Sequence, residues 1–537
     1  MKKTYLTILF IVISTFIFTT SCAKRGTING GAKDTIAPRI TSSFPDNFST
    51  NFSGREIKIN FNELIKVKDI NKQLIISPPL EKQPTIIPQG SASKFISIKI
   101  LEDLKPNTTY SFNFGQSITD NNEGNPYSQF KYVFSTGSYI DSLALLGNIK
   151  DAYEQNPDNF VNIQLYDATT FKDSTVFKET PLYVTNTLDS LKVFALENLK
   201  AGTYKIIALK DKNNNYKYDP KSDKIGFLDE TITLPVDNTL YEIELFKEKP
   251  KFKVEKPIQQ SNNKFFMGYQ GDIKDVKITA KMGLEEIPVK MTKFPDKGKD
   301  SVQLFFPVSK LDTLEISIKK DNYIKNFKTK VKELKLTDSL KINAVQNTLN
   351  FRDKFTLKTK TPINSIDKNK ITLTNKDSIV IPFEYSYNEY EEEILFDFKK
   401  EENQKYQIEL LPGAITDFYN TINDSLRFSF NTKLLSDYGN LKVIIKNANR
   451  FPYILEVLTA KGDVVASAIS NDENIIYFDA IEPSIYTLRI IYDDNKNNIW
   501  DTGDYLNKKY AEEIVYYPKG IDVRANWDVE QEFDLGE

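Results

Sequence analysis

Short segments in which apolar and polar residues alternate recur along the chain from Pro38 onward. Clear examples are EIKINF (56–61), FISIKI (95–100), YSFNF (110–114), YKIIAL (204–209), LEISIK (314–319) and YTLRII (486–491). Alternation with a period of two places one face of a strand against a core and the other in water, as in antiparallel sandwiches. Turn-forming residues separate these segments at intervals of about 8 to 12 residues, and no long amphipathic helix pattern interrupts them. We therefore predict an all-β, multi-domain array of β-sandwiches.

The first residues follow a different pattern, which predicts an export signal. Lys2 and Lys3 precede an apolar run from Leu6 to Phe18, and small residues then lead to Cys22. The run is shorter than the roughly 20 apolar residues that span a bilayer, so it fits the core of a signal peptide. We assign residues 1–21 to a signal peptide and exclude them from the fold.

Cys22 is the only cysteine in the chain, and it stands where a lipoprotein signal peptidase would cut. We expect a diacylglyceryl group on Cys22, because several acyl chains together hold a protein stably at a membrane. The alternative is an unmodified cysteine beside an ordinary cleavage site. Residues 22–37 would then be the lipidated cysteine and a Gly-rich flexible tether. A single cysteine permits no internal disulfide, so the modules must be stable through core packing alone.

Two segments of the chain share a first set of repeated motifs. Residues 38–137 contain Tyr110, Ile118-Thr119-Asp120 and Phe134-Ser135-Thr136, and residues 345–433 contain Tyr406, Ile415-Thr416-Asp417 and Phe430-Asn431-Thr432 at nearly equal spacing. The first segment also has Gly124-Asn125-Pro126, which the second lacks. The first segment resembles the bacterial Ig-like domain of the S-layer-protein type. The opening of the chain also resembles that of Bacteroidetes lipoproteins that begin with this domain. The resemblance implies a spacer or binding module without catalytic residues.

A second pair of segments, 140–249 and 434–537, shares another motif. Tyr204 precedes Asp211 by seven residues, and Tyr486 precedes Asp493 by seven residues, at the ends of matching strands. These segments resemble the prealbumin-like or carboxypeptidase-regulatory-like β-sandwich. Residues 250–344 form another β-rich segment, without a motif that identifies it.

An acidic and amide-rich loop of the form D-x-N-x-N-x-x-(aromatic)-D follows each of these strands. The oxygen-bearing residues are Asp211, Asn213, Asn215 and Asp219 in the first loop, and Asp493, Asn495, Asn497 and Asp501 in the second. Calcium binds six to eight oxygen ligands, and the spacing resembles the first half of an EF-hand loop. The pattern departs from that loop in two ways. Tyr216 and Asn498 replace the usual glycine, and no glutamate closes the loop, so that Asp223 and Asp504 would have to supply the missing ligand. The alternative is a metal-free turn, because Asp and Asn bond to their own backbone.

Charge and composition exclude several classes of function. Lys plus Arg is 71 and Asp plus Glu is 73, and this balance argues against a nucleic-acid partner. The chain contains no histidine, which removes Ser-His-Asp and Cys-His catalysis and zinc sites that use imidazole. Only paired carboxylates or a Ser-Lys set remain as catalytic groups. We therefore predict that the protein is not an enzyme and has no cofactor apart from structural calcium.

Together these patterns predict a non-catalytic, lipid-anchored cell-envelope protein that acts as a modular scaffold or binding protein. The alternatives are a surface adhesin or glycan-binding component and a glycosidase that uses two carboxylates. The tyrosines of YSYNEYEEE (385–393) are candidates for glycan contact, but the pattern of this segment favours an edge-strand or core role for them. The expected partners are the membrane, through the lipid, and an envelope protein or glycan. Ala23, Lys24 and Arg25 after Cys22 favour an outer-membrane anchor that faces the periplasm.

Overall fold

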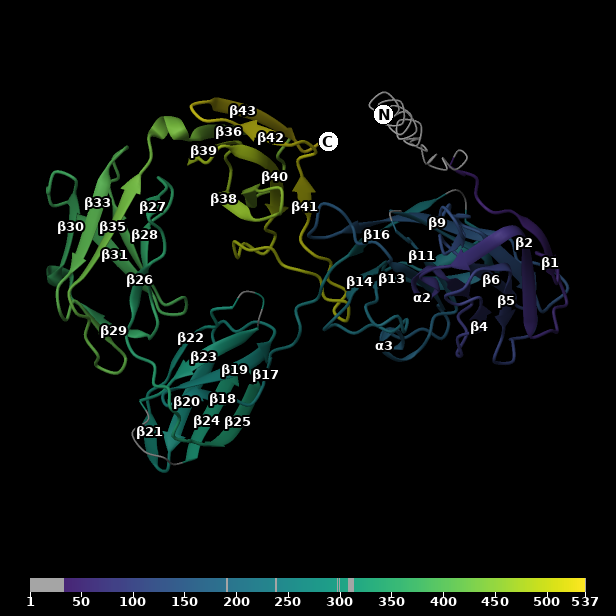
Figure 1. Cartoon of the computed structure of the whole chain (residues 1–537), viewed down its shortest axis with the longest axis horizontal. Helices are drawn as coiled ribbons and strands as arrows, with labels where there is room; N and C mark the ends of the chain where they lie inside the picture. Colours follow the sequence, from purple (N-terminus) through teal and green to yellow (C-terminus); the bar gives the residue numbers. More distant parts are fainter. Residues whose placement is uncertain are drawn as a thin grey trace, which may run out of the picture. The chain divides into compact units, whose positions relative to one another are not determined.

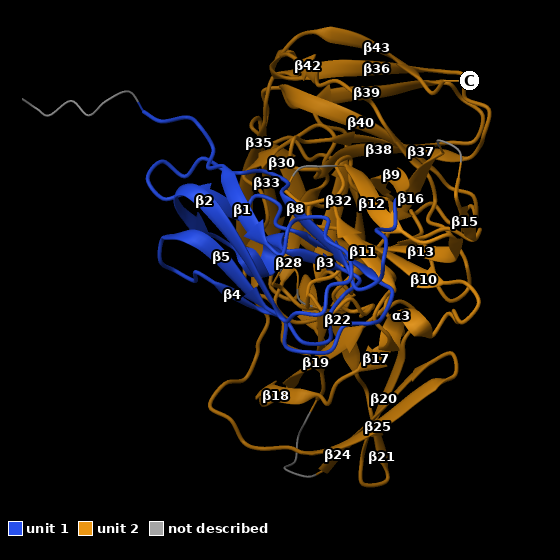
Figure 2. Cartoon of the chain, turned by 90° about the vertical axis from the view of Figure 1, so that its right-hand side faces the viewer, with its two compact units in different colours: residues 1–142 blue, residues 143–537 orange. Residues whose placement is uncertain are grey.

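The computed structural model describes residues 33–189, 192–236, 239–296, 298, 300–307 and 313–536. The predicted signal peptide and Cys22 lie outside the described residues. The chain divides into two compact units, residues 1–142 and 143–537 (Figure 2). Almost all regular structure is β-strand, so the predicted all-β class is confirmed, and Figure 1 shows the strands grouped into successive sandwiches. Within the described residues, no helix is long and apolar enough to cross a membrane.

Strand pairing is confined to five groups of consecutive strands, which we number as modules 1 to 5. Module 1 contains β1 (Ile40–Phe44), β2 (Glu56–Val67), α2 (Ile70–Gln73), β3 (Ile75–Ser77), β4 (Thr85–Ile87), β5 (Ser93–Lys99), β6 (Thr109–Asn113), β7 (Ile118–Asp120) and β8 (Lys131–Ser135). Its sheets have the orders β1-β2-β5-β4, with β7 paired to β2, and β3-β6-β8.

Module 4 repeats this topology. It contains β26 (Ile342–Ala344), β27 (Thr348–Leu349), β28 (Phe355–Thr359), β29 (Ile363–Ile366), η1 (Lys368–Lys370), β30 (Ile371–Asn375), β31 (Phe383–Asn388), β32 (Glu393–Phe398), β33 (Lys405–Leu410), β34 (Ile415–Asp417) and β35 (Leu426–Thr432). The order β26-β28-β32-β31 matches β1-β2-β5-β4, and β30-β33-β35 matches β3-β6-β8. Its first strand begins at Ile342, slightly before the boundary expected at residue 345.

The shared motifs of modules 1 and 4 hold equivalent turns. The hydroxyl groups of Tyr110 and Tyr406 accept hydrogen bonds from the backbone N–H groups of Lys105 and Glu401, at 3.0 and 2.8 Å. The Asp120 carboxylate accepts four backbone N–H groups from the turn that follows it. Burial tends to raise the pKa of Asp120, but these four donors outweigh it and lower the pKa.

Modules 2 and 5 form a second matching pair. Module 2 contains β9 (Leu143–Asp151), β10 (Asn162–Asp167), α3 (Thr175–Lys178), β11 (Tyr183–Asn186), β12 (Val193–Leu199), β13 (Gly202–Lys210), β14 (Lys224–Phe227), β15 (Ile232–Leu234) and β16 (Leu240–Leu245). Module 5 contains η2 (Leu435–Asp437), β36 (Gly439–Lys446), β37 (Tyr453–Leu458), β38 (Val464–Ser470), β39 (Ile475–Ile481), β40 (Ser484–Tyr492), β41 (Ile514–Tyr516), β42 (Ile521–Val523) and β43 (Asp528–Asp534).

The sheet orders of this pair correspond strand by strand. Module 2 has β11-β10-β13-β14 and β12-β9-β16, and module 5 has β38-β37-β40-β41 and β39-β36-β43. The last strand of each module also runs parallel to its first strand. The repeat seen in the sequence is therefore a repeat of topology.

Module 3, the segment without an identifying motif, has a different arrangement. It contains β17 (Lys253–Val254), β18 (Ile258–Ser261), β19 (Lys264–Gln270), β20 (Lys277–Met282), β21 (Glu285–Ile287), β22 (Lys290–Lys293), β23 (Ser301–Phe305), β24 (Thr313–Lys320) and β25 (Tyr323–Lys330). Its sheets have the orders β17-β19-β23-β22 and β21-β20-β24-β25.

The tyrosine-rich segment 385–393 lies where module 4 meets module 3. Tyr385 and Tyr387 lie on β31 and pack against the core of module 4, whereas Tyr390 packs against the core of module 3. Lys290 and Lys293 of module 3 form ion pairs with Glu389 and Glu391, at 2.5 and 2.8 Å. These contacts place the segment in a joint between two modules.

Candidate functional site: the acidic loops and the joint between modules 2 and 5

The two acidic loops begin directly after corresponding strands. Asp211 follows β13 and Asp493 follows β40, so each carboxylate is held at the end of a central strand, and both side chains are buried. Asp211 accepts hydrogen bonds from the backbone N–H groups of Asn215 and Tyr216, at 2.8 and 2.7 Å. Asp493 accepts the equivalent bonds from Asn497 and Asn498, at 3.0 and 2.8 Å.

The backbone of the two loops also matches residue by residue. Tyr216 and Asn498, which stand where an EF-hand loop has glycine, both have left-handed φ angles, of 59° and 64°. The side-chain oxygens of Asn215 and Asn497 accept hydrogen bonds from the N–H groups two residues later, at 2.8 and 2.9 Å. This geometry is that of successive Asx turns, so the turn interpretation of the motif describes the backbone correctly.

A second buried carboxylate closes each loop. Asp223 accepts from the N–H groups of Lys212 and Asp219, at 3.1 and 2.9 Å. Glu512 takes the corresponding place in the second loop, where it accepts from the N–H group of Asp501 at 2.9 Å. Asp504, the expected closing ligand, instead caps a separate turn through the N–H group of Asn507 at 2.9 Å. Sequence spacing could identify Asp223, but Glu512 lies much farther along the chain from the motif than Asp223 does.

The expected metal ligands converge only in part. In the second loop, the side-chain amides of Asn495 and Asn497 lie 2.5 and 2.6 Å from one carboxylate oxygen of Asp501, and the Lys249 ammonium lies 2.7 Å from the other. In the first loop, Asp219 accepts the N–H group of Lys221, and the Asn213 side chain is exposed. No group of three or more Asp, Glu, His or Cys residues within the described parts of the chain could hold a metal ion.

The electrostatics of the two loops differ. Burial raises the pKa of Asp211, and its backbone N–H donors offset this only partly. Burial also acts to raise the pKa of Asp501, but Lys249 and the two asparagine amides outweigh it and lower the pKa to about 2. Asp501 is therefore ionised, and Lys249 of module 2 compensates its charge.

The aromatic residue of each loop enters a core that modules 2 and 5 share. Tyr218 from the first loop, Phe227 and Phe246 from the same module, and Tyr505 from module 5 are all buried in this core, with Trp500 packed against it. The rings of Phe227 and Tyr505 lie 5.4 Å apart in an edge-to-face arrangement. The aromatic residue before the last aspartate of the motif, Tyr218 in the first loop and Trp500 in the second, therefore contributes to this shared core.

Polar contacts surround the shared core. Glu248 accepts hydrogen bonds from the Tyr218 hydroxyl and from the backbone N–H group of Tyr505, both at 2.6 Å. One carboxylate thus joins the aromatic residue of the first loop to the segment that follows the second. We call this set of contacts, with the shared core and the Lys249–Asp501 pair, the 2–5 joint.

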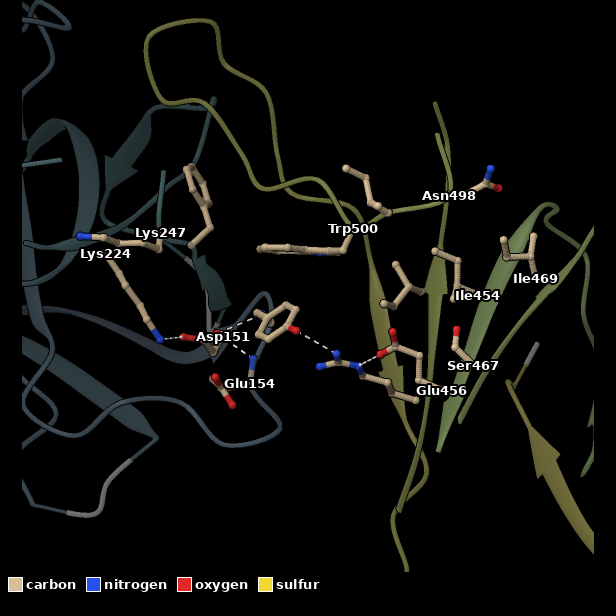
Figure 3. A pocket seen from close by; sticks show the side chains of 15 residues that line it. Asp151, Glu154, Lys224, Lys247, Ile454, Glu456, Ser467, Ile469, Asn498 and Trp500 are labelled. Carbon is tan, nitrogen blue, oxygen red and sulfur yellow. Dashed lines mark hydrogen bonds and ion pairs between the residues drawn. The ribbon is translucent and has the colours of Figure 1, made fainter. Parts of the chain in front are cut away.

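A cavity of about 500 Å³ lies beside the 2–5 joint. Figure 3 shows Asp151, Glu154 and Lys224 on one side, Ile454, Glu456 and Ser467 on the other, and Trp500 between them. The ring centroids of Trp500 and Tyr153 lie 4.7 Å apart.

Most charges around the cavity are paired with one another. The buried Arg489 guanidinium bonds to Glu456 at 2.6 Å and to the Tyr153 hydroxyl at 2.9 Å, and Lys224 bonds to Asp151 at 2.5 Å. Arg489 and Tyr153 belong to different modules, so this pairing also strengthens the joint. The cavity therefore presents aromatic and isoleucine surface more than free charge.

Comparison with known proteins assigns part of the chain. A search of curated proteins finds no match. Among solved structures, the surface-layer protein SbsC (domains 1–6) is 12% identical and covers 91% of this chain and 67% of its own, with a TM-score of 0.16. A Bacteroides ovatus protein, SGBP-B of a mixed-linkage glucan utilization locus, solved with a mixed-linkage heptasaccharide, is 11% identical and covers 83% and 99%, with a TM-score of 0.18. The major pilin subunit of Bacillus cereus is 11% identical and covers 73% and 99%, with a TM-score of 0.14.

These low TM-scores carry no functional argument. The sequence match is firmer for the first module, whose predicted family is confirmed: residues 34–136 match the family described as "Bacterial Ig-like domain".

Proposed function

We propose that the chain is a non-catalytic cell-envelope protein, anchored through a lipid on Cys22, whose β-sandwich modules form a scaffold. The observation that supports this most directly is the 2–5 joint. There Arg489, Glu248 and Lys249, polar residues of the kind that could serve a reaction, are bonded to groups of the opposite module. The prealbumin-like resemblance of modules 2 and 5 fits the same role. We place the anchor in the outer membrane, with the modules facing the periplasm.

Replacing Cys22 by alanine should release the protein from the membrane. In cells fed an alkyne-labelled fatty acid, the wild type should carry the label and enter the detergent phase, because acyl chains provide most of the binding free energy. The Cys22→Ala variant should carry no label and, once residues 1–21 are removed as well, should remain in the aqueous phase. Ser21→Ala is the matched control and should behave as the wild type. Equal labelling of Cys22→Ala and the wild type would reject the anchor.

A glycan-binding role is the second candidate, because Trp500 and Tyr153 form an aromatic wall in a cavity with carboxylates nearby. The soluble Cys22→Ala protein separates the two roles. Trp527 is the only other tryptophan, so a Trp527→Phe change leaves Trp500 as the reporter of the cavity. Saturable quenching by envelope polysaccharide, without hydrolysis, would favour glycan binding over a purely structural role.

Calcium remains our proposal for a structural ligand of the two loops, with Asn495, Asn497 and Asp501 as its best-placed ligands. Asparagine amides can turn their oxygens toward an ion, and an ion would replace Lys249 as the counter-charge of Asp501. Titration calorimetry should show weak binding of about two ions per chain, together with a raised melting temperature.

The Asp501→Asn variant should lose the second calcium site. Asp504→Asn is its control, because Asp504 caps a separate turn, and it should bind as the wild type does. Absence of both heat and stabilisation in the wild type would mean that the loops are metal-free Asx turns.

A further inference from the structure

One edge strand of module 5 lacks the charged and proline residues that normally protect a sheet edge. β38 and β39 are each the end strand of their sheet, and no strand pairs with the outer edge of β38 within the described part of the chain. The sequence of β38, VVASAIS, contains no charged residue and no proline. Unpaired edge strands normally carry such residues, because a bare row of N–H and C=O groups pairs with other chains.

The same edge exposes apolar side chains from both sheets. Val464, Ile469, Ile475 and Tyr477 are exposed by 48, 47, 44 and 61%. Val464 and Ile469 lie on β38, whereas Ile475 and Tyr477 lie on β39 of the other sheet. Ile469 also lines the cavity beside the 2–5 joint (Figure 3). The exposed side chains of β38 therefore add apolar surface to its unpaired backbone edge.

The opposite edge of module 5 is protected in the usual way. β43, DVEQEFD, carries four acidic residues. Glu530 and Glu532 are paired with Lys442 and Lys446 on the neighbouring strand, at 2.8 and 2.7 Å. Module 5 therefore has one edge strand with acidic residues, β43, and one edge strand without any charged residue, β38.

Module 2 provides an internal control, because its topology is the same. The counterpart of β38 is β11, which has only four residues, and its Tyr183 and Val184 are buried. The connection that precedes β11 contains α3, whose Val176 is also buried. In module 5 this connection is reduced to a tight turn, closed by the N–H group of Thr459 on the carbonyl of Asp463 at 2.9 Å. Module 5 thus has no counterpart of α3 before its longer edge strand.

We infer that this edge binds the same edge of a second copy of the chain, with the two β38 strands antiparallel across a two-fold axis. The row of backbone groups requires an extended polypeptide as its partner. The pattern of β38 is nearly symmetric about Ser467, with Ala466 and Ala468 on either side and Val465 and Ile469 beyond them. Antiparallel pairing therefore sets residues of similar size opposite one another.

Charges beyond the strand favour the same arrangement. Lys461 and Asp463 precede β38, so this end carries no net charge, and the acidic Asp472 and Glu473 follow the strand. An antiparallel pair keeps the two acidic ends apart, whereas a parallel pair would set them together. A β-bulge near Val465 shifts the register at one end, and Ala466 to Ser470 remain in continuous register with β37. Isologous contact of this kind closes as a dimer.

Sedimentation velocity of the soluble Cys22→Ala protein over a range of concentrations tests the inference. We expect a monomer–dimer equilibrium, and we expect Ile469→Lys to weaken the dimer by about tenfold or more, because each lysine would place a charge opposite Val465 of the other copy and on the unpaired edge. Ile324→Lys is the matched control, since Ile324 is an exposed isoleucine of β25, the end strand of a sheet in module 3. It should dimerise as the parent does.

Hydrogen exchange gives a second readout that does not depend on a variant. Amides of residues 464–470 should become protected as the protein concentration rises, whereas those of β43 should not change. A protein that stays monomeric at all concentrations, or a dimer that Ile469→Lys leaves intact while its melting curve is native, would overturn the inference.

Discussion

Replacing Tyr505 by alanine should open the 2–5 joint at a cost of about 3–5 kcal/mol, the usual range for removing a buried aromatic ring. The Tyr505 ring is fully buried and lies 5.4 Å from Phe227 and 6.4 Å from Tyr218, measured between centroids. The ammonium of Lys508 lies 4.1 Å from the centre of the same ring. Removing the ring leaves a cavity in the core that the two modules share.

Hydrogen exchange is the suitable measurement, because a chain of several modules does not unfold in one step. Amides of β14 and of the second acidic loop should lose protection in Tyr505→Ala, whereas those of module 1 should not change. Tyr505→Phe is the matched control. The Tyr505 hydroxyl is buried and has no hydrogen-bond partner among the described residues, so its removal should be neutral or stabilising. Equal protection of β14 in Tyr505→Ala and the wild type would show that the joint does not depend on this ring.

Replacing Glu392 by glutamine should remove a pH dependence from the contact between modules 3 and 4. Glu392 is buried, one of its oxygens has no hydrogen-bond partner among the described residues, and the other accepts from Gln303 at 3.3 Å. Burial, only partly offset by Lys264 and Lys358, raises its pKa from 4.5 to about 7.

A raised carboxyl pKa means that the folded state holds the proton more tightly than the unfolded state. Stability is therefore highest below pH 4.5, falls as the pH rises towards 7, and is constant above that value. The difference corresponds to about 3 kcal/mol. Glutamine resembles the protonated acid in shape, so Glu392→Gln should be more stable than the wild type at pH 8 and equal to it at low pH.

Hydrogen exchange of β23 and β32 at pH 5 and pH 8, corrected for intrinsic rates, would measure this effect. Glu391→Gln is the control, because Glu391 forms a partly exposed ion pair with Lys293 and should leave the pH dependence in place. The same slope in Glu392→Gln and the wild type would assign the pH dependence to another group.

Local patterns in the sequence predicted the strands and the repeats well. Four of the six alternating segments named at the outset lie wholly on strands, and the other two end one residue past theirs, because a period of two is set by the pleat of the strand itself. The motif tyrosines also have local partners: Tyr204 and Tyr486 each donate to a carbonyl four residues earlier, at 2.9 and 2.5 Å. Because the two partners are only four residues apart, such a contact appears in the sequence as a motif with fixed spacing.

The 2–5 joint could not be predicted in this way. Glu248 and Tyr505 meet although 257 residues separate them, and neither belongs to a repeated motif. For the tyrosines of segment 385–393 the sequence favoured a core or edge-strand role, but it gave no sign that Tyr390 packs against the core of module 3. Contacts between modules depend on surfaces that form only after each module has folded, so no periodicity along the chain records them.

The 2–5 joint also determines how the chain would carry a mechanical load. A force applied between module 2 and the last residues would pass directly to module 5 through the shared aromatic core, the Lys249–Asp501 pair and the Arg489–Tyr153 bond. Modules 3 and 4 would bear no tension until that connection broke, and the segment 250–433 would then be released as extra length. Because the joint bears the load first, modules 3 and 4 would not be stretched as long as it holds.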